Sequence, residues 1–427
     1  HSIHFKMSFH SLIDKPNELL EYVNKCLKPK TEEKKQFGEV FTPIKLVNEM
    51  LDKLDECYIK EHNKSIFEIH NFKWFDLANG IGIMLIAVYM RLIKYHDKKH
   101  ILENMLYSSE LNKNNNFIYR QIMDFENEYS LNINEGDTLE LDINKKWDID
   151  GFDVIISNPP FQDVSNKNIS KGGTNLFTKF INYGFNNVKC NGYLLFITPI
   201  SWLSPSTNKQ TGHDLLHNIF MKYDLIYLNL NECKKYFNVG STFSYYLIQK
   251  TITENILTKV VSEYNKKITY DNIDFKKLIN MKFLPIHINK NTLELVNNIT
   301  INPNKLKIER CRELDTSTKA KKHLSLERTE KFKYITYHTA TKTYYADIKL
   351  DLYDKPKILL NMAGFLKTVF VENCNITESK FYIIPENNEE CDKILKLLEN
   401  DEVIEYLKLC KYSGFNSRPV IESISYK

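Results

Sequence analysis

The chain has 427 residues, a formal net charge of +4 and 42% hydrophobic residues, enough apolar material for the cores of about two domains. No apolar run reaches the length of a membrane span, and the longest candidate, Gly192–Leu203, is interrupted by Pro199. The amino terminus carries no secretory signal pattern. These features exclude a membrane-spanning or secreted protein, so we expect an intracellular one.

The eight cysteines are scattered and form no Cys-x-x-Cys pair. Scattered thiols in a chain of this size indicate a reduced compartment and no zinc site. No cysteine follows a proline. Because methylation of cytosine C5 needs a thiolate nucleophile, usually presented after a proline, the sequence argues against that chemistry.

Apolar periodicity predicts alternating helices and strands through the first part of the chain. This alternation favours an α/β fold with a doubly wound, seven-stranded sheet. After residue 250 the pattern becomes irregular, so we place a domain boundary near Thr251, with domains at 1–250 and 251–427. The expected elements, in chain order, are a helix at 43–57, a strand at 74–78, a helix at 84–95, a strand at 106–111, a helix at 112–128, strands at 131–137 and 152–157, a helix at 176–188, and strands at 193–198, 225–230 and 243–249.

A turn with two glycines follows the first predicted strand. In the sequence Asp76-Leu77-Ala78-Asn79-Gly80-Ile81-Gly82, the glycines let the backbone approach a ligand closely. The next helix begins there, and its amino end carries partial positive charge. The third glycine of a dinucleotide fingerprint is replaced by Leu85, so that motif is not present. Taken alone, the pattern also fits a plain tight turn.

The most informative motif is Asn158-Pro159-Pro160-Phe161, which follows the buried-type strand 152–157. Open α/β sheets bind ligands at the carboxyl ends of their strands. The Asn158 side-chain oxygen and the Pro159 carbonyl can both accept hydrogen bonds from one NH2 group. The two prolines fix the backbone, and Phe161 offers a face for stacking a base. A proline-rich exit from a strand is the alternative reading.

Together these segments resemble the N6-adenine DNA methyltransferases with the gamma motif order: cofactor motifs, catalytic motif, then target recognition domain. Residues 37–43, which include Phe41 and Thr42, resemble the family's first motif, which opens a helix and touches the methionine part of S-adenosylmethionine. Residues 76–82 resemble the cofactor loop, with Leu77 where proline is commoner, and 158–161 match the catalytic motif in full. The resemblance covers roughly residues 36–250 and implies a Rossmann-like methyltransferase fold. We also expect Thr42 to cap the first helix.

Two acids at strand ends are predicted to contact the cofactor. Glu110 ends the second strand, where a carboxylate can accept both ribose hydroxyls. Asp137 ends the third strand, where the family uses an acid to accept from the adenine amine. Either acid can instead face water. The resemblance and these positions predict the following cofactor-binding residues: Phe41, Thr42, Asp76, Ala78, Gly80, Gly82, Glu110, Asp137, Asn158 and Pro160.

Two further segments resemble family motifs. Residues 171–177 resemble a segment that lines the cofactor pocket, although their glycines also fit a mobile loop. Residues 235–243 resemble the last catalytic-domain motif, in which an aromatic ring lies across from the catalytic one. Phe237 is the predicted ring, with Tyr236 as the alternative, and a core aromatic is the other reading.

Positive charge is concentrated in the predicted second domain. Residues 303–345 carry eleven Lys and Arg against five acids, so this segment is +6 and the other residues sum to −2. Aromatic residues interleave it. Such clusters suit contact with phosphates and bases, although a solvated charged face has the same composition.

The predicted function is methyl transfer from S-adenosylmethionine to N6 of an adenine rotated out of double-stranded DNA. The predicted catalytic residues are Asn158, Pro159, Pro160, Phe161 and Phe237. No metal or covalent intermediate is implied, and we expect a monomer and an α+β target recognition domain. A fused nuclease is not expected, because only about 36 residues precede the first motif; a separate cognate restriction endonuclease remains open.

Three other functions share features with this sequence. RNA adenine methyltransferases and protein-glutamine methyltransferases share the Asn-Pro-Pro-aromatic motif, because each acts on an NH2 group of the same kind. The long basic segment after the sheet favours nucleic acid over protein. A non-catalytic specificity protein would have lost Asn158 or the cofactor acids, and all are present. The sequence does not specify the DNA site.

Overall fold

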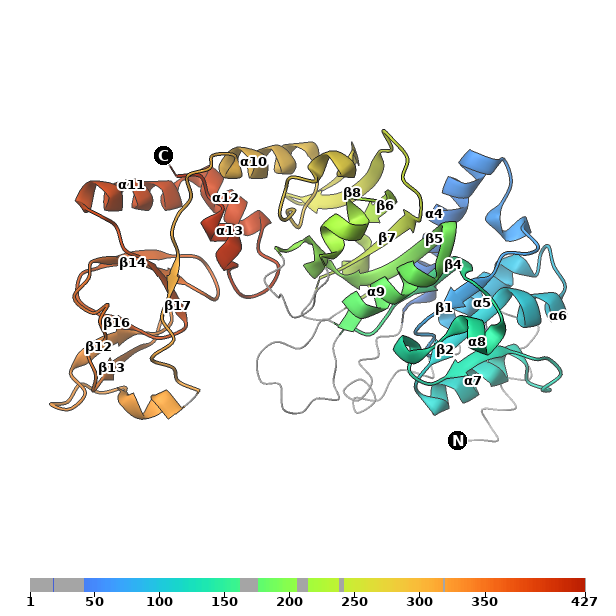
Figure 1. The fold of residues 1–427 in the computed structure, drawn as a ribbon, viewed down its shortest axis with the longest axis horizontal. Helices are drawn as coiled ribbons and strands as arrows, with labels where there is room; N and C mark the ends of the chain where they lie inside the picture. The colour runs from blue at the N-terminus through green and yellow to red at the C-terminus, as the bar shows by residue number, and fades with distance from the viewer. Residues whose placement is uncertain are drawn as a thin grey trace. The chain divides into compact units, whose positions relative to one another are not determined.

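The computed structural model describes residue 18 and residues 42–161, 176–205, 214–237, 242–317 and 319–426. The chain forms two compact units. The first unit ends at Asn280, and the second begins at Met281 and also takes a short segment starting at Ser201. Each unit has its own sheet structure (Figure 1).

The first unit is built on a nine-stranded sheet with the order β3-β2-β1-β4-β5-β7-β6-β8-β9. The five neighbouring strands β3, β2, β1, β4 and β5 are parallel to one another. Strand β7 is antiparallel to both of its neighbours, β5 and β6. The α/β fold with a mostly parallel doubly wound sheet is therefore as predicted. The strands are β1 (Trp74–Asp76), β2 (Leu106–Glu110), β3 (Asn132–Glu135), β4 (Phe152–Ser157), β5 (Val188–Pro199), β6 (Asp224–Asn229), β7 (Phe243–Gln249), β8 (Thr258–Tyr264) and β9 (Lys267–Ile273).

The sheet and its compact unit extend beyond the seven strands and the boundary near Thr251 that the sequence predicted. All seven predicted strands are present, but β8 pairs parallel to β6, and β9 pairs with β8. The compact unit consequently continues to Asn280. Most of β9 is exposed, including its apolar residues Ile268 and Tyr270, so it has neither a continuous apolar run nor a buried apolar face.

Helices cover both faces of the first sheet. On one face, α4 (Ile44–His62) packs against α5 (Ile83–Leu92). On the other face, Gly184 of α9 (Leu176–Asn187) packs closely against the side chains of Leu77, Leu194 and Phe196. This unit also contains the shorter helices α6 (Lys98–His100), α7 (Lys113–Met123) and α8 (Ile143–Trp147).

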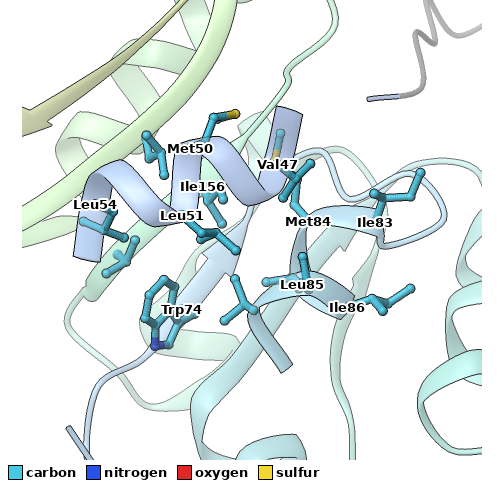
Figure 2. Packing of buried hydrophobic residues seen from close by; sticks show 14 of the residues in the cluster. Val47, Met50, Leu51, Leu54, Trp74, Ile83, Met84, Leu85, Ile86 and Ile156 are labelled. Carbon is cyan, nitrogen blue, oxygen red and sulfur yellow. The ribbon is translucent and has the colours of Figure 1, made fainter. Parts of the chain in front are cut away.

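The α4–α5 face forms a continuous hydrophobic core. The apolar residues of α4 recur at helical spacing and meet α5 and the strand side chains Trp74 and Ile156 (Figure 2). Val47, Leu51 and Leu54 are fully buried. At about 25 cal/mol per Å² of apolar area, burial of this kind contributes much of the stability that holds α4 on the sheet. The packing fixes the start of α4, and with it Thr42, close to the sheet's carboxyl edge.

The second unit is α+β, as predicted. It contains two four-stranded sheets, with the orders β10-β17-β14-β15 and β11-β13-β12-β16. Within the residues described, no helix combines the length and the apolar character that crossing a membrane requires. The elements are β10 (Glu309–Arg310), β11 (Leu324–Ser325), β12 (Tyr334–Tyr337), β13 (Thr343–Ala346), β14 (Lys357–Asn361), β15 (Thr368–Val371), β16 (Asn375–Ile376), β17 (Lys380–Ile383), α10 (Lys290–Thr300), α11 (Asn388–Glu399), α12 (Asp401–Leu409) and α13 (Arg418–Glu422).

Candidate cofactor and catalytic site

The carboxyl ends of β2, β1 and β4 lie side by side, because the three strands are parallel neighbours. Asp76 ends β1, Glu110 ends β2, and Asn158 directly follows β4. Residues separated by as many as 82 positions are thus brought to one edge of the sheet. This is the edge at which open α/β sheets bind ligands.

The glycine turn between β1 and α5 needs its glycines. Gly80 and Gly82 have φ angles of 56° and 95°, in the left-handed region that favours glycine. A Cβ on Gly82 would lie 2.1 Å from Cδ2 of the buried Tyr119 ring. The turn is therefore a tightly packed loop that exposes its backbone at the start of α5.

Asp76 is buried, with 2% of its surface exposed. Its Oδ1 accepts hydrogen bonds from the Ser157 hydroxyl (2.7 Å) and from the Ala78 amide (3.0 Å). Burial raises the pKa of the Asp76 carboxyl to about 7, although the two hydrogen bonds oppose that shift. Asp76 thereby links the ends of β1 and β4 and titrates near neutral pH.

Glu110 holds the glycine turn from the neighbouring strand. Its Oε2 accepts from the Gly80 amide (2.7 Å), and its Oε1 accepts from the Asn112 amide (2.8 Å). Burial raises the pKa of Glu110, with the backbone hydrogen bonds opposing. Its predicted contact with ribose stays a prediction, since the carboxylate is seen here bound to the turn.

Asp137 lies apart from this group. It is exposed and begins a short 3-10 helix, Thr138–Glu140, where its carboxylate accepts from the Leu139 amide at 2.9 Å. It follows β3, which borders β2. Its predicted contact with the cofactor adenine stays a prediction.

A small pocket joins the glycine turn to the catalytic motif. It brings together five of the predicted residues, and it adds Asn79, which sequence reasoning did not select. Nothing in the sequence distinguishes the Asn79 side chain from the other positions of the turn. The pocket is lined by Thr42, Asp76, Ala78, Asn79, Gly80, Ile81, Ile83, Met84 and Asn158.

Thr42 contacts the catalytic motif directly. The Asn158 Nδ2 donates a hydrogen bond to the Thr42 hydroxyl at 3.0 Å. The predicted helix cap is wrong, because α4 has Pro43 at its N-cap and no side-chain cap. The Thr42 hydroxyl instead directs the amide nitrogen of Asn158, so the carboxamide oxygen faces away from Thr42.

The aromatic residues do not form a simple pair of facing rings. Phe161 packs edge-on against Phe243, with ring centroids 5.4 Å apart, and Phe243 in turn contacts Phe237 at 5.3 Å. Phe237 is only 8% exposed, whereas Tyr236, the alternative, is partly exposed. Pro159 is buried and Pro160 is half-buried. Stacking of a base by Phe237 stays a prediction.

Several predicted segments cannot be placed. Phe41 and the rest of 37–41, residues 171–175 and residues 238–241 lie outside the described residues. In the portion of the chain that is described, no group of three or more His, Cys, Asp or Glu side chains is arranged to hold a metal ion.

The second unit contains an open, basic groove of about 750 Å³. Its lining includes Arg310 and Arg312, together with Phe415 and Asn416 from the far end of the chain. Neither arginine forms an ion pair with another described residue. The sequence prediction of a basic cluster included both arginines but not the residues near 415, which lie about a hundred positions away.

A known family model matches part of the first unit. A family model described as "Eco57I restriction-modification methylase" matches residues 78–233. This segment is therefore similar to restriction-modification methylases, in agreement with the resemblance seen in the sequence, and S-adenosylmethionine is the cofactor that such methylases imply. No curated protein matches the chain.

Solved structures show the same fold at low identity. The type IIL restriction-modification enzyme MmeI, solved with DNA, is 11% identical with a TM-score of 0.59, over 96% of this chain and 69% of that chain. A nuclease-deletion mutant of the type ISP enzyme LlaGI is 12% identical with a TM-score of 0.58, over 94% and 54%. The type ISP enzyme LlaBIII is 14% identical with a TM-score of 0.52, over 91% and 38%. This chain thus spans between about a third and two thirds of these longer proteins.

We expect the raised pKa of Asp76 to make its carboxylate destabilising at neutral and alkaline pH. The folded state holds the proton more tightly than the unfolded chain, so stability from this group falls as pH rises from about 4 to about 7. Asp76→Asn keeps the acceptor oxygen without the charge. Chemical denaturation should find the variant more stable than the parent at pH 8, by up to about 4 kcal/mol.

That stability difference should shrink as the pH is lowered and vanish below about 3, where the parent carboxyl is protonated in both states. An equal difference between variant and parent at pH 5 and pH 8 would show that Asp76 does not titrate in this range.

Proposed function

We propose that the protein transfers a methyl group from S-adenosylmethionine to the N6 amine of an adenine in double-stranded DNA. The observation that carries the proposal is the Asn-Pro-Pro-Phe motif at the carboxyl end of β4. Its Asn158 side chain is held by Thr42 beside the glycine turn. A carboxamide acceptor next to a cofactor loop is what chemistry on an NH2 group requires.

The residues around the pocket fit the cofactor. When bound, S-adenosylmethionine supplies a methyl group on a positively charged sulfur, which is already a strong electrophile. Asp76 offers a carboxylate that ionises near neutral pH, which suits a cationic ligand. The Gly80–Gly82 turn offers backbone groups at a helix amino end, and we infer that Glu110 and Asp137 receive the ribose and the adenine.

The catalytic motif acts by positioning the target amine. The Asn158 carboxamide oxygen and the Pro159 carbonyl accept from the N6 hydrogens, which draws the nitrogen lone pair out of ring conjugation. The protein then needs no charged general base, because alignment supplies much of the rate. The adenine must leave the duplex to reach these groups. Phe161 stacks on it, which is worth on the order of 1–3 kcal/mol.

The second unit supports DNA as the substrate. Its groove carries Arg310 and Arg312 beside an aromatic ring and an amide, a combination suited to phosphates and base edges. MmeI was solved in complex with DNA, and LlaGI with a DNA substrate mimic. A basic groove of this kind favours DNA over a protein-glutamine substrate. The monomeric state and a separate cognate endonuclease stay predictions.

Replacing Asn158 with Ala should abolish transfer of labelled methyl groups to duplex DNA, because the acceptor for the N6 hydrogens is lost. S-adenosylmethionine binding, measured by calorimetry, should weaken far less than methyl transfer, because Asn158 is only one of the residues that line the cofactor pocket. Asn187→Ala is a matched control, since Asn187 ends α9 near the amino end of β5, at the opposite edge of the sheet. Near-normal turnover of Asn158→Ala would contradict the proposed chemistry.

Replacing Lys319, Lys321 and Lys322 together with Gln should weaken binding to specific and non-specific duplexes alike. The three lysines form one turn of 3-10 helix and are exposed, so they are free to track phosphates. Each lost phosphate contact should reduce the slope of log affinity against log salt by about 0.9. Fluorescence anisotropy over a salt series measures that slope.

A control triple variant should have Lys94, Lys98 and Lys99 replaced with Gln. These exposed lysines of the first unit carry the same total charge. If both triple variants kept the parent's slope, the second-unit cluster would be a solvated face. If both lowered it equally, net charge alone would account for the effect.

A further inference from the structure

A relay of hydrogen bonds crosses the core of the first unit from α4 to β6. The Glu49 carboxylate of α4 accepts from the Tyr245 hydroxyl of β7 at 2.8 Å. An ionised carboxylate only accepts, so the Tyr245 proton points to Glu49, and the Tyr245 oxygen accepts from the Tyr227 hydroxyl to which it is hydrogen-bonded. The Asn229 Nδ2 in turn donates to the Tyr227 hydroxyl at 3.1 Å. Both tyrosines and Asn229 are buried.

The register of the sheet places the members of this relay together. Asn229 of β6 lies directly opposite Tyr245 of β7, and Tyr227 is two positions away along β6. Residues two apart on a strand point to the same face, and diagonal neighbours across two strands are within reach of long side chains. Both tyrosines belong to the hydrophobic core that α4 covers. A buried tyrosine hydroxyl needs a partner, and Glu49 supplies the final acceptor.

The other end of the relay fixes the turn that carries Phe237. The Asn229 Oδ1 accepts from the amides of Asn231 and Glu232, both at 2.9 Å, where a short 3-10 helix begins. The Phe237 amide then donates to the Cys233 carbonyl at 3.0 Å. Because the Asn229 Oδ1 faces two backbone donors, its Nδ2 must face the tyrosine hydroxyl. One carboxamide therefore joins the turn to the relay.

The turn also contacts the catalytic motif through its aromatic rings. Phe237 packs against Phe243, and Phe243 packs against Phe161. Burial raises the pKa of Glu49, and the hydrogen bond from Tyr245 opposes that shift, so the carboxylate depends on this donor. Removing one member of a buried network leaves the others unsatisfied. A change at Glu49 is therefore transmitted to the side of the site where the target base is expected.

We propose that Glu49 is a positioning residue for the target base, because it holds the turn that carries Phe237 through Tyr245, Tyr227 and Asn229. The effect on the reaction rests on the proposed function, whereas the coupling between α4 and the turn does not. Glu49 is not among the residues that line the cofactor pocket, so its influence on the reaction is exerted through the relay.

Amide hydrogen exchange, followed by mass spectrometry on the full chain, tests the coupling. Glu49→Ala and Tyr245→Phe should each speed exchange of the amides in 231–237 by roughly tenfold, because a hydrogen bond to a charged group is lost. Glu49→Gln keeps an acceptor oxygen and should stay within about threefold of the parent. Parent-like exchange at 231–237 in both Glu49→Ala and Tyr245→Phe would overturn the proposal.

Asp55→Ala is the matched control on the same helix. The Asp55 Oδ1 accepts from the Ser65 hydroxyl at 2.8 Å and from the Ile66 amide at 2.9 Å. This variant should speed exchange around Ile66 and leave 231–237 as in the parent. If it deprotected 231–237 as strongly as Glu49→Ala does, a general loosening of α4 would explain the effect, and the relay would be refuted.

Methyl transfer to unmethylated genomic DNA connects the coupling with the reaction. Glu49→Ala should lower kcat by roughly tenfold or more, because the groups around the target base lose their alignment. Its affinity for S-adenosylhomocysteine, measured by calorimetry, should stay within about twofold of the parent, since the relay lies outside the cofactor pocket. In a Phe237→Ala background, Glu49→Ala should cause little further loss of kcat, because the two residues act together.

The outcomes separate this inference from the proposed function. An unchanged kcat in Glu49→Ala, or the same fractional loss with and without Phe237, would refute the positioning of the target base. If the parent itself transfers no methyl group to DNA, the proposed function fails, and the exchange data still decide whether Glu49 holds the turn.

Discussion

Parallel pairing of β2, β1 and β4 is the constraint on which the candidate site depends. It brings Glu110, Asp76 and Asn158 to one edge of the sheet, and hydrogen bonds then connect them across strands. Ser157 bonds Asp76, and Glu110 bonds the Gly80 amide. The core between α4, α5 and the sheet adds Thr42 to the group, because α4 starts where its apolar residues can be buried. The site is thus built by the fold's own hydrogen bonding and packing.

The same site is unfavourable for the stability of the free protein. Two carboxylates are desolvated there, and burial raises the pKa of both. The Asn79 carboxamide is buried and has no hydrogen-bond partner among the described residues. Groups of this kind are tolerated where function needs them and where the surrounding core supplies stability. The close-packed α4–α5 face, with its fully buried leucines and valine, is that surrounding core.

Sequence reasoning succeeded where a strong local signal coincided with a structural need. The strands 152–157 and 243–249 were predicted to the residue, because a buried strand requires continuous apolar residues. It failed for β9, which is mostly exposed and has no continuous apolar run. It also missed Asn79 and misread Thr42 as a helix cap, because both roles depend on contacts across the fold. That Arg310 and residues near 415 line one groove was equally invisible along the chain.

Sequencing DNA from an expressing host tests most directly whether the chain methylates adenine N6 in DNA. A modification-sensitive method should find N6-methyladenine at one recurring DNA sequence in cells that express the parent chain. Cells that express Asn158→Ala should lack it. Unmodified adenines in the parent sample, with the protein folded and bound to its cofactor, would contradict the account.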